Sequence, residues 1–339
     1  MSLPRRPFAV LTAVSLLGLA SVLSGRGTGV TPGVLSIPID LTRNYPACGQ
    51  FTCHAPFPNS GGLVRMVITA SQTSIDLGGQ ITGSAQANGG VQTPNNLGGF
   101  CLETVAGTFT PVTACQVGRD LFFNPVPTIL THTSYSSRTW AFSFRAPSLP
   151  GPLEWYGITN TVNGDGQNTG DSWDWWQPTN VNSTPGIPFR LYVNAFGVRA
   201  FGSACPGTGG LAPVIGAQVI PAVGASTFAV QTINVADSAI VLSLLGYSDT
   251  TFGGIPLPFD LGVIQATGCF LRTNIVLTQS GIATGTAGVP GSGVATVPWP
   301  IPSDPALRGS GLIFQSLVVD PTANAAGLTM SAGLRVTIQ

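Results

Sequence analysis

The sequence predicts an all-β protein that consists of two β-sandwich domains in tandem. Short apolar runs, in which every second residue faces the same side, recur along the chain. Clusters of glycine, proline, asparagine and serine separate these runs, and no long stretch has helical periodicity. At about 150 residues per domain, a chain of 339 residues favours two domains. Packing two sheets face to face is the simplest way to bury one side of such strands.

Seven segments show the alternation most clearly, and we expect a strand in each. Within RTWAFSFRAP, for example, Trp140, Phe142 and Phe144 would share one face of a strand. The seven segments are residues 62–71, 138–147, 189–198, 226–235, 269–280, 311–321 and 332–339.

The first residues have the pattern of a secretory signal peptide. Arg5 and Arg6 precede an apolar run that is too short for a bilayer span of about 20 residues, and small residues follow it. We therefore expect a signal peptide at 1–25, a linker at 26–45, and an exported mature chain without a transmembrane segment, placed outside the cell, at its surface or in the periplasm. The glycine-rich stretch near 196–210 predicts a boundary between one domain at 46–196 and another at 200–339.

The charge pattern argues against a nucleic-acid partner. Thirteen basic and 13 acidic residues give a formal net charge of zero, and the chain has no lysine. A nucleic-acid binder would need a basic stripe to neutralise phosphates.

The segment CGQFTCH suggests two different structures. Cys48, Cys53 and His54 resemble the Cys-x-x-Cys-His site of c-type haem, in which two thiols bind the porphyrin and the histidine ligates iron, although four residues separate the thiols here. The only other histidine, His132, would be the second axial ligand, with Met66 as an alternative. A Cys48–Cys53 disulfide explains the segment equally well in an exported chain. A metal site on the same thiols is a third interpretation.

The other four cysteines fall into two pairs, each within one predicted domain. We expect disulfides between Cys101 and Cys115 and between Cys205 and Cys269.

The loop NGDGQNTGD has two interpretations. A tight glycine turn between strands is one. A weak calcium site on Asp165 and Asp171, with Asp174 as a third ligand, is the other.

Three tryptophans follow this loop in the segment DSWDWW. Trp173 and Trp175 would lie on one face of a strand and Trp176 on the other. We expect at least one exposed ring, which could stack on a sugar or a haem edge. The alternative is that the rings complete a sandwich core or a domain interface.

Several of these features resemble known exported modules. The aromatic strand and Gly-Asp loop of 138–176, together with CGQFTCH, AGTFTP (106–111) and LTHTS (130–134), are similar to the Reeler-like β-sandwich, also called choice-of-anchor V, over residues 46–195. That resemblance implies a role for Cys48, Cys53, His54 and His132 as one site. Residues 200–339 resemble a C-terminal β-domain that is common on secreted planctomycete proteins.

Two hypotheses for function follow. The first is an exported electron-transfer protein that carries covalent haem c on Cys48 and Cys53 and acts with a redox partner. The second is a disulfide-stapled binding, adhesion or structural module of the cell surface or matrix, without a cofactor. A hydrolase is disfavoured, since no Gly-x-Ser-x-Gly elbow occurs and the mature chain has only two glutamates, Glu103 and Glu154, in unrelated segments.

Overall fold

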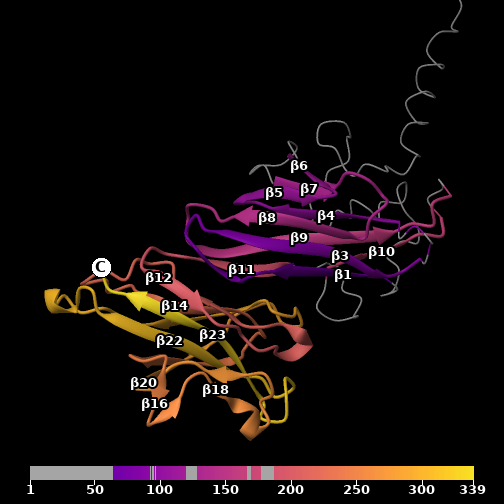
Figure 1. Cartoon of the computed structure of the whole chain (residues 1–339). Helices are drawn as coiled ribbons and strands as arrows, with labels where there is room; N and C mark the ends of the chain where they lie inside the picture. The colour runs from indigo at the N-terminus through magenta and orange to yellow at the C-terminus, as the bar shows by residue number, and fades with distance from the viewer. Residues whose placement is uncertain are drawn as a thin grey trace, which may run out of the picture.

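The protein is all-β, as the alternating sequence pattern predicts (Figure 1). The structure is a computed structural model that describes residues 64–91, 93, 95, 97–119, 128–165, 169–176 and 187–339. Within these residues the helical segments are single 3-10 turns: η2 (Thr208–Gly210), η3 (Leu261–Ile264) and η4 (Pro305–Leu307). No helix in the described part of the chain is long and apolar enough to cross a membrane.

The first domain is a sandwich of a four-stranded and a seven-stranded sheet. The four-stranded sheet has the order β1 (Val64–Ala70), β3 (Gln80–Gly89), β8 (Thr139–Arg145) and β5 (Thr108–Thr113). The larger sheet has the order β2 (Ser74–Asp76), β11 (Phe189–Asn194), β9 (Gly151–Thr161), β4 (Gly98–Thr104), β7 (Thr128–His132) and β6 (Cys115–Arg119), and β10 (Ser172–Trp175) pairs with the second half of β9.

The second domain contains a five-stranded and a three-stranded sheet and two short hairpins. The five-stranded sheet has the order β12 (Val198–Phe201), β23 (Leu328–Thr337), β22 (Gly311–Val319), β15 (Ile240–Gly246) and β20 (Leu277–Ile282). The three-stranded sheet has the order β13 (Val214–Gly216), β14 (Ala229–Val235) and β21 (Gly293–Pro298). The hairpins pair β16 (Thr251–Phe252) with β17 (Ile255–Pro256), and β18 (Phe259–Asp260) with β19 (Phe270–Leu271).

The aromatic residues of β8 form the centre of the first core, as their spacing predicts. Trp140, Phe142 and Phe144 are all buried between the two sheets. Phe100 of the opposing sheet stacks on Trp140 with ring centroids 4.4 Å apart. Met66 lies in this same core on β1, so its thioether serves packing.

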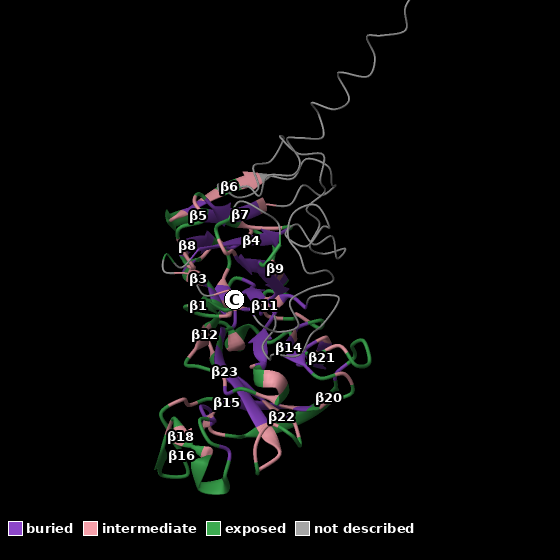
Figure 2. Cartoon of the chain, turned by 90° about the vertical axis from the view of Figure 1, so that its right-hand side faces the viewer, coloured by how far each residue is buried: buried purple, intermediate pink, exposed green. Residues whose placement is uncertain are grey.

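Part of the seven-stranded sheet is buried on its outward side as well, and β4 and the second half of β9 are buried throughout (Figure 2). A second apolar cluster there consists of Cys101, Ile129, Ile158, Trp173 and Trp175. Every residue of β4 is buried, so this strand is covered on both of its faces.

The Cys205–Cys269 disulfide that we expected is present in the second domain. It packs with Leu244, Leu271 and Met330, between the five-stranded sheet and the chain that carries the short hairpins. The disulfide thereby attaches the segment with the short hairpins to the five-stranded sheet.

The chain passes from the first domain to the second between the end of β11 and the start of β12, and the two sandwiches are stacked (Figure 1). Tyr192 on β11 is fully buried and packs with Val214 and Ile233 of the second domain. An apolar cluster thus bridges the two domains.

Polar contacts at the junction lock the same strands together. The Tyr192 hydroxyl donates to Gln231 Oε1 at 2.6 Å. Asn194 is fully buried, and its amide nitrogen donates to Ser74 Oγ at 2.8 Å while its Oδ1 accepts from the Ala217 N–H at 3.2 Å. Because every polar atom of this side chain must find a partner when buried, the contact fixes the geometry of the joint.

Candidate functional site

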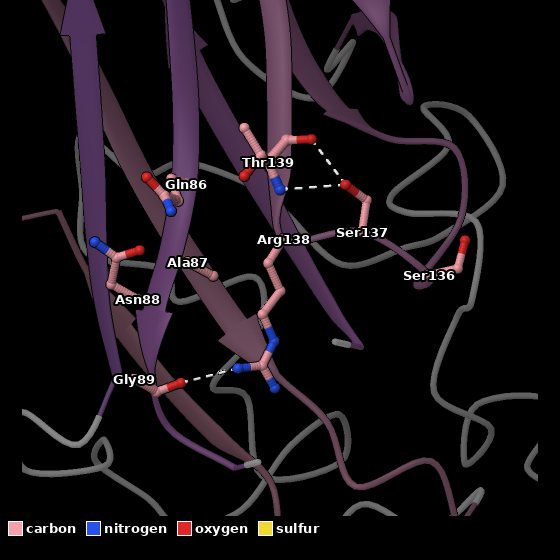
Figure 3. Close-up of a pocket in the computed structure, with 8 residues that line it drawn as sticks. All are labelled: Gln86, Ala87, Asn88, Gly89, Ser136, Ser137, Arg138 and Thr139. Atoms are coloured by element: carbon pink, nitrogen blue, oxygen red, sulfur yellow. Dashed lines mark hydrogen bonds between the residues drawn. The ribbon is translucent and has the colours of Figure 1, made fainter. Parts of the chain in front are cut away.

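A polar pocket opens at one end of the four-stranded sheet (Figure 3). Its volume is about 430 Å³, and it is formed by the end of β3, the start of β8 and the serine-rich turn that leads into β8. The lining residues are Gln86, Ala87, Asn88, Gly89, Ser136, Ser137, Arg138 and Thr139.

Arg138 holds one wall of this pocket together. Its Nε donates to the Leu97 carbonyl at 3.0 Å, its Nη1 to the Gly89 carbonyl at 3.1 Å, and its Nη2 to the Val91 carbonyl. Partial burial lowers the pKa of the guanidinium, which still carries its charge at neutral pH. The side chain therefore clamps the turn that follows β3.

The remaining pocket groups are neutral amides and hydroxyls. Ser137 Oγ is used locally, since it donates to the Thr139 carbonyl at 2.8 Å and accepts from the Thr139 N–H at 3.2 Å. Gln86 lies directly opposite Thr139 in the ladder, and both side chains are exposed. The carboxamides of Gln86 and Asn88 make no hydrogen bond within the described structure and are open to a ligand. No pattern in the sequence marked these residues, because β3 and the turn before β8 meet only in the folded sheet.

His132 is buried at the end of β7. Its Nδ1 accepts from the Phe100 N–H at 3.1 Å, and its ring lies 6.4 Å from that of Trp140, centroid to centroid. A side chain at Gly99 would meet the imidazole at 2.5 Å, so glycine is required beside it. His132 is not among the residues that line the described pocket.

The other three residues of the expected haem site, Cys48, Cys53 and His54, lie outside the described residues, as do the signal peptide and the linker. Haem attachment and the Cys48–Cys53 disulfide therefore remain predictions from the sequence.

The expected Cys101–Cys115 disulfide is wrong for this structure, in which the two cysteines are not bonded to each other. Cys101 on β4 lies opposite Thr131, and Cys115 on β6 lies opposite His132, with β7 between them. Neighbouring residues of β7 point to opposite faces of the sheet, so the two thiols do too. The two cysteines are therefore too far apart, and their side chains point in opposite directions, so a disulfide cannot form between them.

Cys115 instead serves the first core. Its thiol donates to the Ala141 carbonyl at 3.2 Å, and burial raises the pKa of the thiol.

The expectation of an exposed tryptophan ring is also wrong. Trp173, Trp175 and Trp176 are 1%, 3% and 7% exposed. Trp173 and Trp175 lie together in the outward cluster of the seven-stranded sheet, and Trp176 lies in the sandwich core, as their alternation predicts. The rings complete two apolar layers and present no stacking platform.

The loop NGDGQNTGD lies between β9 and β10, and the structure describes its residues 163–165 and 169–171. Asn163 organises it, since its backbone N–H donates to Asp171 Oδ1 at 3.0 Å and its side-chain amide donates to Asp165 Oδ2 at 2.9 Å. Asp174 is fully buried, and its Oδ1 accepts from the Trp175 N–H at 2.8 Å. The described residues contain no group of three or more histidine, cysteine, aspartate or glutamate side chains that could hold a metal, so calcium at Asp165 and Asp171 remains a prediction from the sequence.

The fold brings together the two glutamates that the sequence separates. Glu103 on β4 lies directly opposite Tyr156 on β9. Glu154 is two residues before Tyr156 on β9 and points to the same side of the sheet. The Tyr156 hydroxyl donates to Glu154 Oε2 at 2.7 Å, and Arg190 Nε donates to Glu154 Oε1 at 3.2 Å. Burial and then the Glu154 charge raise the pKa of Tyr156. Arg190 and Glu154 therefore form an ion pair on the face of the sheet, and Tyr156 is hydrogen-bonded to the same carboxylate.

No protein-family model and no curated protein matches this chain. Solved structures that it resembles include a cohesin module of a glycoside hydrolase from Clostridium perfringens, with 11% identity, 34% of this chain and 95% of that chain covered, and a TM-score of 0.24. The C-terminal domain of the Streptococcus pyogenes antigen I/II-family protein AspA matches with 9% identity, 82% and 99% coverage and a TM-score of 0.26. Domains D2 and D3 of the Corynebacterium diphtheriae major pilin SpaD match with 9% identity, 78% and 88% coverage and a TM-score of 0.25. These TM-scores are too low for the matches to carry an argument about function.

Proposed function

We propose that the chain is an exported surface module that works by binding or by structural support, without a cofactor and without catalysis. The observation that carries this proposal is the junction between the domains, where Tyr192 and Asn194 are buried and hydrogen-bonded on both sides. A joint of this kind makes one stiff unit from two sandwiches, which suits a protein that presents or spaces a surface.

The disulfide supports the same proposal. Cys205–Cys269 is the cross-link expected of a chain that folds in an oxidising compartment. The described pocket is lined by neutral amides and hydroxyls around one arginine, a set of groups suited to recognition.

Two measurements on the full chain test the proposal. Intact cells of the source organism should be labelled by an antibody against the second domain and should lose the label after brief external proteolysis. Protein purified from a host that can attach haem should be colourless, with no Soret absorption. A cytoplasmic location, or a Soret band that survives denaturation and disappears in Cys53→Ser, would overturn the proposal and establish the haem hypothesis instead.

A further inference from the structure

The outward face of the four-stranded sheet carries rows of hydroxyls and amides, together with Arg65 opposite Asn88 and Arg145 opposite Gln80. Thr82 of β3 and Thr110 of β5 are exposed and lie on either side of Ser143 of β8, which is 8% exposed. Thr69 of β1 lies opposite Ser84 of β3, and their hydroxyl oxygens are 2.7 Å apart. Residues that lie directly opposite in a ladder point to the same face, so these groups form rows across the sheet.

The polar pocket continues this array at one end of the sheet. Gln86 and Asn88 follow Thr82 and Ser84 on the same face of β3, because alternate residues of a strand share a side. Figure 3 shows the Gln86 carboxamide level with Thr139 on the neighbouring strand, and the Asn88 carboxamide on the other side of the β3 ribbon from the Arg138 side chain.

The chemistry of the lining selects among ligand classes. An apolar ligand would leave the amides and hydroxyls unpaired, which is unfavourable. A cation finds no carboxylate among the lining residues. Arg138 is the one cationic residue of the lining, and its three nitrogens already donate to the carbonyls of Leu97, Gly89 and Val91. Arg65 lies opposite Asn88 in the ladder of β1 and β3 and is the residue that an anionic ligand on this face would use instead.

A neutral, hydroxyl-rich ligand fits the groups that remain. Each carboxamide offers both a donor and an acceptor, as each sugar hydroxyl does. We propose that the pocket at Gln86, Asn88 and Thr139, with the hydroxyl rows beside it, binds a neutral polysaccharide. This proposal rests on the proposed function and names the ligand class of the surface module.

The test is retention of the full chain on insoluble neutral polysaccharides, with cellulose, chitin and mannan as the probes. The wild-type chain should be retained on at least one of them. The variant with both Gln86→Ala and Asn88→Ala should lose about tenfold in affinity, as expected for two lost hydrogen bonds. Gln279→Ala removes an equally exposed carboxamide from β20 of the second domain and should bind like the wild type. All three side chains are exposed at the surface, so the variants should fold.

Salt separates the proposed ligand from an acidic one. Binding of a neutral polymer should be unchanged when NaCl is raised to about 0.5 M, whereas an anionic polymer held by Arg65 would be released by screening. Stronger retention on pectate than on every neutral probe, no retention on any probe, or equal retention of the double variant would each overturn the proposal. A surface-exposed, colourless protein that binds no polysaccharide would refute this inference and leave the proposed function standing.

Discussion

The hydroxyl of Tyr192 in the first domain donates to Gln231 Oε1 in the second domain at 2.6 Å, within a buried apolar cluster. This hydrogen bond and the packing around the ring tie the movement of one sandwich to that of the other. Burial also raises the pKa of Tyr192, so the phenol stays neutral at the pH values where the protein is folded.

Removing this hydroxyl should weaken the junction. Tyr192→Phe should lower the free energy of unfolding by about 1 kcal/mol, the typical net value of a hydrogen bond between neutral groups. Urea denaturation followed by circular dichroism measures the change. Tyr247→Phe is the matched control, because that ring is 61% exposed and its variant should unfold like the wild type. Equal midpoints for the two variants would contradict a role for the Tyr192 hydroxyl.

Gly216 lies against the Tyr192 ring, and a larger residue should force the domains apart. A Cβ atom at Gly216 would lie 2.0 Å from Cδ1 of Tyr192. Overpacking of this kind costs about 1–3 kcal/mol, so Gly216→Ala should raise the radius of gyration measured by small-angle X-ray scattering. Gly311→Ala is the control, since nothing lies within 4 Å of the added carbon. A Gly216→Ala chain with the wild-type scattering curve would show that the joint adapts.

Loss of the disulfide should destabilise the second domain. Cys205 and Cys269 are 64 residues apart in the sequence, and chain-entropy reasoning gives such a cross-link about 4 kcal/mol. The Cys205→Ser, Cys269→Ser double variant should therefore unfold at a lower urea concentration, measured by circular dichroism. Cys115→Ser tests the specificity, since that thiol makes one core hydrogen bond and should cost less. An identical midpoint for the wild type and the double variant would argue against a stabilising bond.

Alkaline pH should unfold the chain through its buried tyrosines. The pKa values of Tyr156 and Tyr192 are raised in the folded protein, mainly by burial, above the value of about 10 for an unfolded tyrosine. The unfolded state then releases these protons first, so the stability that the two tyrosines contribute is complete below about pH 10 and is lost above it. Absorbance at the tyrosinate band should show a late phase that coincides with unfolding.

Tyrosine-to-phenylalanine variants show which residues give rise to the late phase of the tyrosinate absorbance. Its amplitude should fall in Tyr156→Phe and fall further in the double variant Tyr156→Phe, Tyr192→Phe. A late phase that keeps its full amplitude in the double variant would contradict the burial argument.

The fold was largely predictable from the sequence, because period-two alternation reports directly which side of a strand is buried. The β8 strand with Trp140, Phe142 and Phe144 shows this most clearly. The same logic placed Trp173 and Trp175 on one face and Trp176 on the other. It failed to predict that β4, β7 and the second half of β9 are also buried on their outward side, because the packing of β10 there leaves no mark in those strands.

The site was less predictable, because sequence separation says little about which strands become neighbours. Cys101 and Cys115 are close in the chain, yet β7 lies between their strands. Glu103 and Glu154 are distant in the chain, yet β4 and β9 bring them to one face. The pocket combines Gln86 and Asn88 with a turn almost 50 residues later, and neither segment carries a motif.

The rigid joint between the domains is the central claim, and a distance distribution across it is the most direct test. Genetically encoded spin labels at Thr110 on β5 and Gln279 on β20, both exposed, would report the separation of the two sandwiches by pulsed electron paramagnetic resonance. The account predicts one narrow distance in the wild type and a broad distribution in Gly216→Ala. A broad distribution in the wild type would show that the two domains move independently, and it would contradict the account.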